Sequence, residues 1–154
     1  MKFIKNTTIA IIILLSSFTM QAQKWELENV RNLNKISMDE FKTQMKDAHK
    51  YNYYDKIESE MYNLLEFESA DFVRKIGKFV YPDAKENAIE YCTKDKTEFA
   101  AFKANLIKMG YKIIKSGTVS EFNYSDLKKG TDTIRMLTPK VNPNNNEYYS
   151  ILIY

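Results

Sequence analysis

The sequence predicts an α+β fold in which one antiparallel sheet carries two helices on one face. Two segments have helix-start signals, at Ser37 and at Asp95, and each is followed by short runs rich in Tyr, Ile, Phe and Thr. Turn residues separate these runs, a pattern typical of strands joined by hairpins. An approximate repeat between the two halves further predicts that the strands form a single continuous sheet.

The first helix begins in the stretch ISMDEF. Ser37 can cap the helix while Glu40, three residues later, bonds back to the amide of the cap, which is the pattern of a capping box. Ile36 can pack on Phe41 as a hydrophobic staple. Apolar residues then recur at helical spacing, and the helix is predicted to end near His49.

The second helix begins at Asp95, again with a glutamate, Glu98, three residues later. Gly110 stands where a left-handed residue would end the helix. Its apolar stripe consists of Phe99, Phe102, Leu106 and Met109. This segment is predicted as a helix from its cap, its stripe and its stop together.

Extended segments are predicted after each helix. Those after the second helix are YKIIKSG, VSEFNYSDL, TDTIRMLT and EYYSILIY, and those after the first are NYYDKIES, YNLLEFES, KFVYPD and AIEYCTKD. Within residues 54–69, apolar residues also recur at helical spacing: Ile57, Met61, Leu64 and Leu65. This segment is therefore compatible with either a strand or a helix. The repeat favours strands.

That repeat aligns SMDEFKTQMKDAHKYNYYD with KTEFAAFKANLIKMGYKI at a spacing of 58 residues. The matched pairs are Glu40 with Glu98, Phe41 with Phe99, and Tyr53 with Tyr111. We interpret residues 23–154 as a single domain that contains two pseudo-repeats, 36–94 and 95–154. This interpretation requires both helices to lie on the same face of the sheet.

Residues 1–22 have the three parts of a secretory signal peptide: a basic start, an apolar middle and a small residue, Ala22, at the cleavage point. The apolar run, 9–18, is shorter than the roughly 20 residues that span a bilayer. No cysteine stands near the junction, so a lipid anchor is not expected. The chain is therefore predicted to be exported, to the periplasm or the medium, with no stable membrane insertion after cleavage.

Removal of Lys2 and Lys5 with this leader leaves 21 basic and 20 acidic side chains, interspersed along the chain. Nucleic-acid binding normally requires a concentrated basic surface, so it is not expected here. Cys92 is the only cysteine, which excludes an intramolecular disulfide. Apolar packing must hold the domain together.

Several short motifs of this chain resemble those of a class of small exported proteins from Gram-negative bacteria whose activity is not characterised. They are the MQAQKWEL junction, the DEF and TEF helix starts, the MGY helix stop and the terminal YYSILIY. The resemblance implies export and an α+β fold. None of these motifs is a functional signature, so the resemblance assigns no site residue.

Catalytic and metal chemistry find little support in the sequence. Cys92 and His49 form the only possible thiol–imidazole pair, and each has an ordinary structural interpretation. One His and one Cys cannot supply a zinc site, and the loop DLKKGTD, with two lysines, is a poor calcium loop. No cofactor or metal is expected.

Paired carboxylates are the remaining catalytic candidate. Glu66 and Glu68 flank Phe67 in LLEFES, and on a strand both would point to the same side. An extracytoplasmic hydrolase acting on sugar or peptide polymers could use such a pair. Alternating polar and apolar residues are also the ordinary pattern of a half-buried strand.

Tyrosine is the one residue type in surplus, and it suits binding faces because its ring is large, rigid and polar at the tip. The candidate binding residues are Tyr51, Tyr53, Tyr54, Tyr124 and Tyr148. The function predicted is that of an exported, non-enzymatic domain that binds another protein, such as an inhibitor, an immunity-type protein or an envelope accessory factor. A structural subunit of a larger assembly would instead expose residues 148–154 as an edge strand.

Overall fold

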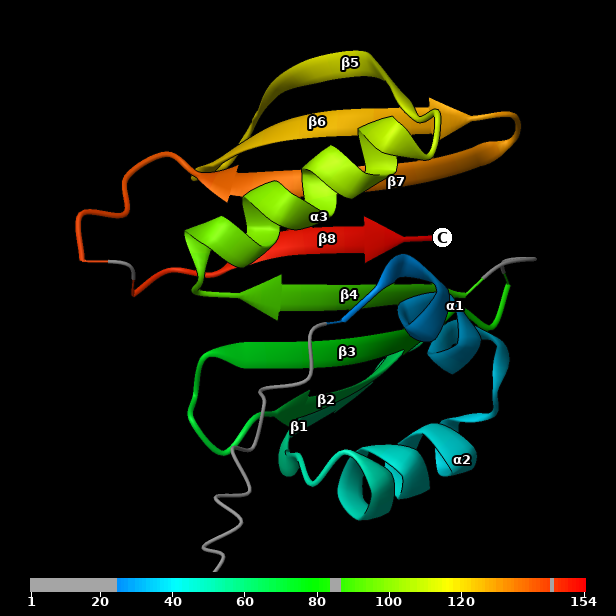
Figure 1. Cartoon of the computed structure of the whole chain (residues 1–154). Coiled ribbons are helices and arrows are strands. Elements are labelled where there is room, and N and C mark those ends of the chain that lie inside the picture. Colours follow the sequence, from blue (N-terminus) through cyan, green and yellow to red (C-terminus); the bar gives the residue numbers. More distant parts are fainter. Residues whose placement is uncertain (1–24, 84–86, 145) are drawn as a thin grey trace, which may run out of the picture.

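The computed structural model describes residues 25–83, 87–144 and 146–154 (Figure 1). The predicted leader and its cleavage point lie outside the described residues. The elements in chain order are α1 (Leu27–Lys35), α2 (Met38–Thr43), a π-helical turn η1 (Gln44–Ala48), β1 (Asn52–Glu58), β2 (Asn63–Glu68), β3 (Arg74–Val80), β4 (Ala88–Thr93), α3 (Lys96–Lys108), β5 (Lys112–Val119), β6 (Phe122–Lys129), β7 (Asp132–Pro139) and β8 (Tyr149–Ile153).

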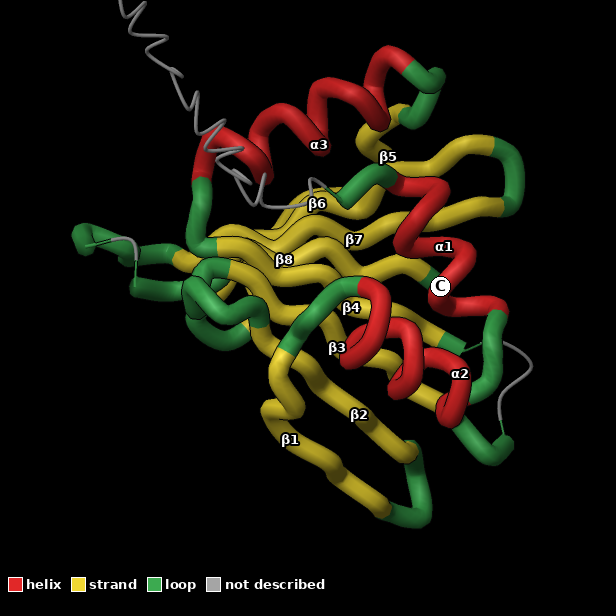
Figure 2. The backbone as a smooth tube through the Cα atoms, turned by 60° about the horizontal axis from the view of Figure 1, so that its bottom comes forward, coloured by secondary structure: helices red, strands yellow, loops and turns green. Residues whose placement is uncertain are grey.

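All eight strands form one antiparallel sheet in the order β1-β2-β3-β4-β8-β7-β6-β5. Figures 1 and 2 show α1, α2 and α3 on the same side of this sheet. The predicted α+β class and the single continuous sheet are therefore confirmed. The ambiguous residues 54–69 form β1 and β2, with a turn between them.

The helix count was predicted wrongly, since a third helix, α1, precedes the other two. No side chain caps its start, and only three of its residues are buried: Leu27, Val30 and Leu33. A mostly polar segment without a capping residue carries no helix signal in the sequence, so α1 was not predicted. Packing of its narrow apolar stripe on the sheet holds α1 in place, with β4 as its main neighbour.

Both predicted helix starts are present. Ser37 forms the complete capping box with Glu40. The carboxylate of Asp95 accepts bonds from the amides of Thr97 and Glu98. Glu98, by contrast, does not bond back to its cap, because its carboxylate points into the protein and binds Arg74.

The core fills the space between the sheet and the helices. Tyr91, at the centre of the sheet on β4, is fully buried, as are Phe41 of α2 and Phe67 of β2. The rings of Phe41 and Phe67 meet edge to face, with centroids 5.7 Å apart. In the second half of the sheet, Phe99 of α3 packs on Tyr149 of β8, with ring centroids 5.0 Å apart.

The two halves meet at the centre of the sheet, where β4 pairs with β8. Each half places its last strand at this centre and its first strand at an edge, so β1 and β5 are the edges. An edge strand at residues 148–154 is therefore excluded, and the assembly-subunit hypothesis loses its stated basis.

The helix exits of the two halves also correspond. Tyr51 follows Lys50, whose φ is 57°, and Tyr111 follows Gly110, whose φ is 94°. Both tyrosines are buried. Structurally, Tyr51 rather than Tyr53 thus matches Tyr111, and the sequence alignment needs a gap within the first helix. A shared origin of the two halves stays a prediction.

These helix exits give a paired stability prediction. Lys50→Gly is expected to raise the free energy of unfolding by about 0.5 to 1 kcal/mol, because glycine adopts a positive φ without steric cost. Gly110→Ala is expected to lower it by about 1 kcal/mol for the converse reason. Urea unfolding of both variants measures this, and a change of the same sign in both would contradict the left-handed helix stops.

Candidate binding face

The side of the sheet opposite the helices, here called the open face, is covered by no element among the described residues (Figure 2). The cross-strand register determines which side chains lie on it. One row crosses all eight strands and consists of Asp55, Glu66, Gly77, Glu90, Leu152, Arg135, Asp126 and Lys115. The next row consists of Glu68, Lys75, Cys92, Ser150, Leu137, Tyr124 and Gly117.

Tyrosines and lysines meet at one end of the open face, around Lys75. The Lys75 ammonium lies 3.3 Å from the centroid of the Tyr54 ring and 4.9 Å from that of Tyr148. Lys94 approaches the same Tyr148 ring at 4.7 Å. Such cation–π contacts orient both rings and amines.

The Tyr148 hydroxyl is fixed by hydrogen bonding. Its oxygen lies 2.8 Å from a Glu68 carboxylate oxygen and 3.1 Å from the Phe72 carbonyl oxygen, so the single O–H is shared between these two acceptors. Burial and the bond to Glu68 raise the pKa of this phenol. The Lys75 Nζ lies 3.9 Å from a Glu68 carboxylate oxygen and completes the cluster, so these side chains hold one another in place.

A second aromatic cluster lies toward the other end of β3. Phe79 and Tyr81 stack with centroids 6.2 Å apart, and Tyr62 lies 5.7 Å from Phe79. All three rings are partly exposed. The open face thus presents aromatic surface at both ends of its first half, the composition that is enriched at protein interfaces.

Between these clusters, two carboxylates flank a glycine. Glu66 and Glu90 are the cross-strand neighbours of Gly77 on either side. A Cβ at Gly77 would lie 3.1 Å from both the Glu66 Cγ and the Leu64 Cδ1, so these two side chains fill the space above the buried glycine. Burial, and then the charge of Glu90, raise the pKa of Glu66.

The second half of the open face is basic. Arg135 forms a two-pronged ion pair with Asp126, at 2.7 and 3.0 Å, and its guanidinium lies 4.7 Å from the centroid of the Tyr124 ring. A Cβ at Gly117 would lie 3.0 Å from this ring, so glycine is needed beneath Tyr124. Lys115, on the edge strand, extends the positive charge.

The five tyrosines proposed from the sequence are placed differently. Tyr54, Tyr124 and Tyr148 lie on the open face, as described above. Tyr53 is half exposed but lies on the helix side, where it packs edge-on against Phe67. Tyr51 is buried and accepts a hydrogen bond from the Trp25 indole at 2.9 Å, so its role is in packing.

The catalytic candidates do not form a recognisable catalytic arrangement. Glu66 and Glu68 do share the open face, but Glu68 is engaged by Tyr148 and Lys75. Cys92 lies on the open face, where burial and then Glu90 raise the pKa of its thiol. His49 lies on the other side, with its ring 4.7 Å from that of Trp25.

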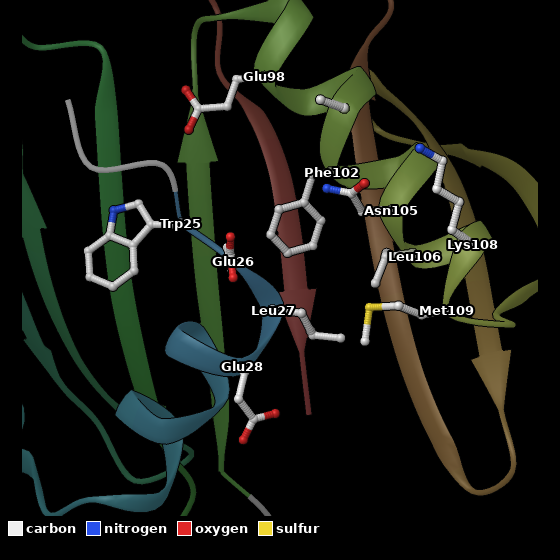
Figure 3. Close-up of a pocket in the computed structure, with 11 residues that line it drawn as sticks. Trp25, Glu26, Leu27, Glu28, Glu98, Phe102, Asn105, Leu106, Lys108 and Met109 are labelled. Atoms are coloured by element: carbon white, nitrogen blue, oxygen red, sulfur yellow. The ribbon is translucent and has the colours of Figure 1, made fainter. Parts of the chain in front are cut away.

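A groove of about 370 Å³ lies on the helix side, between the start of α1 and α3 (Figure 3). Figure 3 shows Leu27 opposite Phe102, with Glu26 and Glu28 beside them. Glu98 also lines it, but this carboxylate is already bound by Arg74 and Tyr91. Its other polar lining residues are Glu26, Glu28, Asn105 and Lys108, beside the apolar Leu27, Phe102, Leu106 and Met109.

Within the described residues, no three His, Cys, Asp or Glu side chains cluster as metal ligands would. The described helices are also too short or too polar for any of them to cross a bilayer. Comparison of the chain with protein-family models, with curated proteins and with solved structures finds no match.

Proposed function

We propose that this chain is an exported, non-enzymatic domain that binds another protein through the open face of its sheet, as an inhibitor, an immunity-type protein or an envelope accessory factor. The observation that supports this most is the fixed array of Tyr54, Lys75 and Tyr148. Rigid aromatic groups lose little conformational entropy on binding, which is why they dominate interface energies.

The leader supports the location in this proposal. A basic start, an apolar middle and a small cleavage residue are typical of proteins that leave the cytoplasm. The balanced charge of the remaining chain is compatible with a protein partner and disfavours nucleic acid. Periplasm and medium both remain open as destinations.

A matched pair of variants tests the surface. Tyr53 and Tyr54 are neighbours on β1, with exposures of 51% and 48%, but they lie on opposite sides of the sheet. The exported chain is immobilised and used to capture binding proteins from envelope and culture extracts of the source cell. Tyr54→Ala is expected to weaken the captured complex at least tenfold, about 1.4 kcal/mol.

Tyr53→Ala serves as the control, since it removes an equal ring from the helix side and is expected to leave capture unchanged. Tyr148→Ala should reproduce the loss seen with Tyr54→Ala. A complex that tolerates both open-face variants but not Tyr53→Ala would place binding on the helix side and contradict the proposal.

A hydrolase of sugar or peptide polymers is the alternative, and the raised pKa of Glu66 beside Glu90 is the observation that favours it. A carboxylic acid of raised pKa beside a second carboxylate is the pairing that glycosidases use. Release of soluble fragments from purified cell-wall polymer by the wild type, abolished in Glu66→Gln, would support this alternative over the binding function.

A further inference from the structure

The two halves of the open face carry opposite net charges. Its β1–β4 half carries Asp55, Glu66, Glu68 and Glu90 against Lys75, whereas its β5–β8 half carries Lys112, Lys115, Lys128 and Arg135 against Asp126. Lys94 stands at the end of β4. One half is thus acidic and the other basic, and the boundary follows the β4–β8 pair at the centre of the sheet.

We infer that this face is self-complementary and that a second copy of the chain covers it in solution. A two-fold axis that runs along the strands between β4 and β8, in the plane of the interface, places each acidic half over the basic half of the other copy. A two-fold interface uses the same patch twice, so it requires this opposition of charge within one patch.

The register gives the pairing a specific contact. The axis places β3 of one copy over β7 of the other, within the same row, so that Arg135 of the second copy faces Gly77 and the flanking carboxylates of Glu66 and Glu90. Asp126 of the second copy faces Glu66 in the same register, and Arg135 lies beside both. When two sheets pack face to face, their strands cross at about 30°, and this rotation displaces facing residues least near the axis. Because β3 and β7 lie close to the axis, Arg135 and Gly77 stay opposite each other.

Arg135 has donors available for this contact. Its Nε and Nη2 each donate once to Asp126, which leaves three of the five guanidinium N–H groups. Lys115 and Asp55 belong to the same row but lie on the edge strands, farthest from the axis, where the crossing of the sheets displaces them most. The carboxylates Glu66 and Glu90 repel each other in the single chain, and a guanidinium between them removes that repulsion.

The available area is sufficient. Eight strands at a spacing of about 4.8 Å, each about six residues of about 3.3 Å long, cover roughly 700 Å². Two such faces together bury an area within reach of the roughly 1,200 to 2,000 Å² of stable protein interfaces. The aromatic clusters supply the apolar part of that surface, and the charged rows supply its register.

This inference rests on the proposed function, because it needs the open face to bind protein. The paired form would shield the face until a partner with a similar division of charge displaces one copy. The two ideas are separable: a chain that is monomeric at every concentration but still captures a partner through Tyr54 would overturn the inference and leave the proposed function in place.

Light scattering after size-exclusion chromatography, over a concentration series of the exported protein, tests the inference. The wild type is expected to approach twice the mass of one chain, and added salt should favour the single chain. One double variant, Glu66→Lys with Glu90→Lys, makes both halves of the face basic. A second double variant, Lys115→Glu with Arg135→Glu, makes both halves acidic. Each double variant is expected to raise the dissociation constant of the dimer more than tenfold.

Mixing the two charge-reversed proteins should restore a one-to-one dimer, since a basic face then meets an acidic one. Glu58→Lys is the control, because this exposed residue of β1 lies on the helix side and should leave the dimer intact. Lys115→Glu with Lys128→Glu, at exposed positions only, replaces the Arg135 variant if that variant does not fold. A wild type that stays monomeric, or a dimer that survives both reversals, would overturn the inference.

Discussion

Replacing Glu98 by glutamine is expected to lower the free energy of unfolding by about 3 to 5 kcal/mol, because it leaves the buried Arg74 guanidinium with only the half-exposed Asp71, 3.4 Å away, as a counter-charge. The Arg74 Nη2 lies 2.8 Å from the Glu98 carboxylate, and the side chains are only 9% and 6% exposed. The hydroxyls of Tyr91 and Thr93 also donate to Glu98. This loss would be a large part of the total stability of a domain of this size.

The position of the pair explains the size of the effect. Arg74 is on β3 of the first half and Glu98 is on α3 of the second, so the pair holds the helix of one half against the sheet of the other. Burial alone lowers the pKa of Arg74, but the bond and charge of Glu98 raise it well above its usual range. Loss of Glu98 removes that compensation.

Urea unfolding of Glu98→Gln measures the loss. Glu58→Gln is the matched control, since Glu58 pairs with Lys56 on the exposed edge, where ion pairs contribute at most about 1 kcal/mol. The double variant Arg74→Met with Glu98→Met should recover part of the stability, because it removes the buried charge, while the Tyr91 hydroxyl loses its acceptor. Equal losses in Glu98→Gln and Glu58→Gln would refute the role assigned to this pair.

Local signals in the sequence predicted the elements that local chemistry determines. The capping box at Ser37 and the cap at Asp95 involve only neighbouring residues, and both are present. The helix α1 was missed because it depends on distant contacts: its buried residues need the sheet, and its last carbonyls bind Lys78 of β3. Nothing within its own sequence records those partners.

The open face was predicted in part, for a related reason. Alternation correctly placed Glu66 and Glu68 together on one side, opposite Phe67. It also separates the neighbours Tyr53 and Tyr54, but it would return Asp55 to the side of Tyr53, whereas a bulge between Tyr53 and Asp55 places Asp55 on the open face with Glu66. Bulges at edge strands arise from the pairing of the sheet and leave no clear mark in a single sequence.

Glu90 and Arg135 were not among the predicted site residues. Each is an ordinary charged residue in a strand, and neither stands in a motif. Their importance comes from the pairing of β4 with β8, which joins strands more than fifty positions apart and aligns both residues in one row. Hairpins can be read from turn residues, but a pairing between two halves of a chain depends on how the whole core packs.

Lys78 leads to the second large prediction, which concerns pH. Its side chain is fully buried, and its ammonium donates to the carbonyls of Leu33, at 3.0 Å, and of Asn34, at the end of α1. Burial lowers the pKa of Lys78 to about 8. A lysine in the unfolded chain keeps a pKa near 10.4.

Between about pH 8 and pH 10.4, the unfolded chain therefore binds more protons at this site than the folded protein does, and stability must rise with pH across that window. Below pH 8 both states carry the charge, and the folded protein bears the full cost of burying it. The total gain from this one group is roughly 3 kcal/mol.

The gain is measured as the difference between the wild type and Lys78→Met, from urea unfolding at a series of pH values between 7 and 10.5. Effects of the titrating tyrosines are common to both proteins and cancel. The stability of the wild type relative to Lys78→Met is expected to be constant up to pH 8 and then to rise by about 3 kcal/mol. Lys46→Met, at an exposed position, should show no such rise, and a flat difference for Lys78→Met would mean that Lys78 keeps its proton in the folded protein throughout this range.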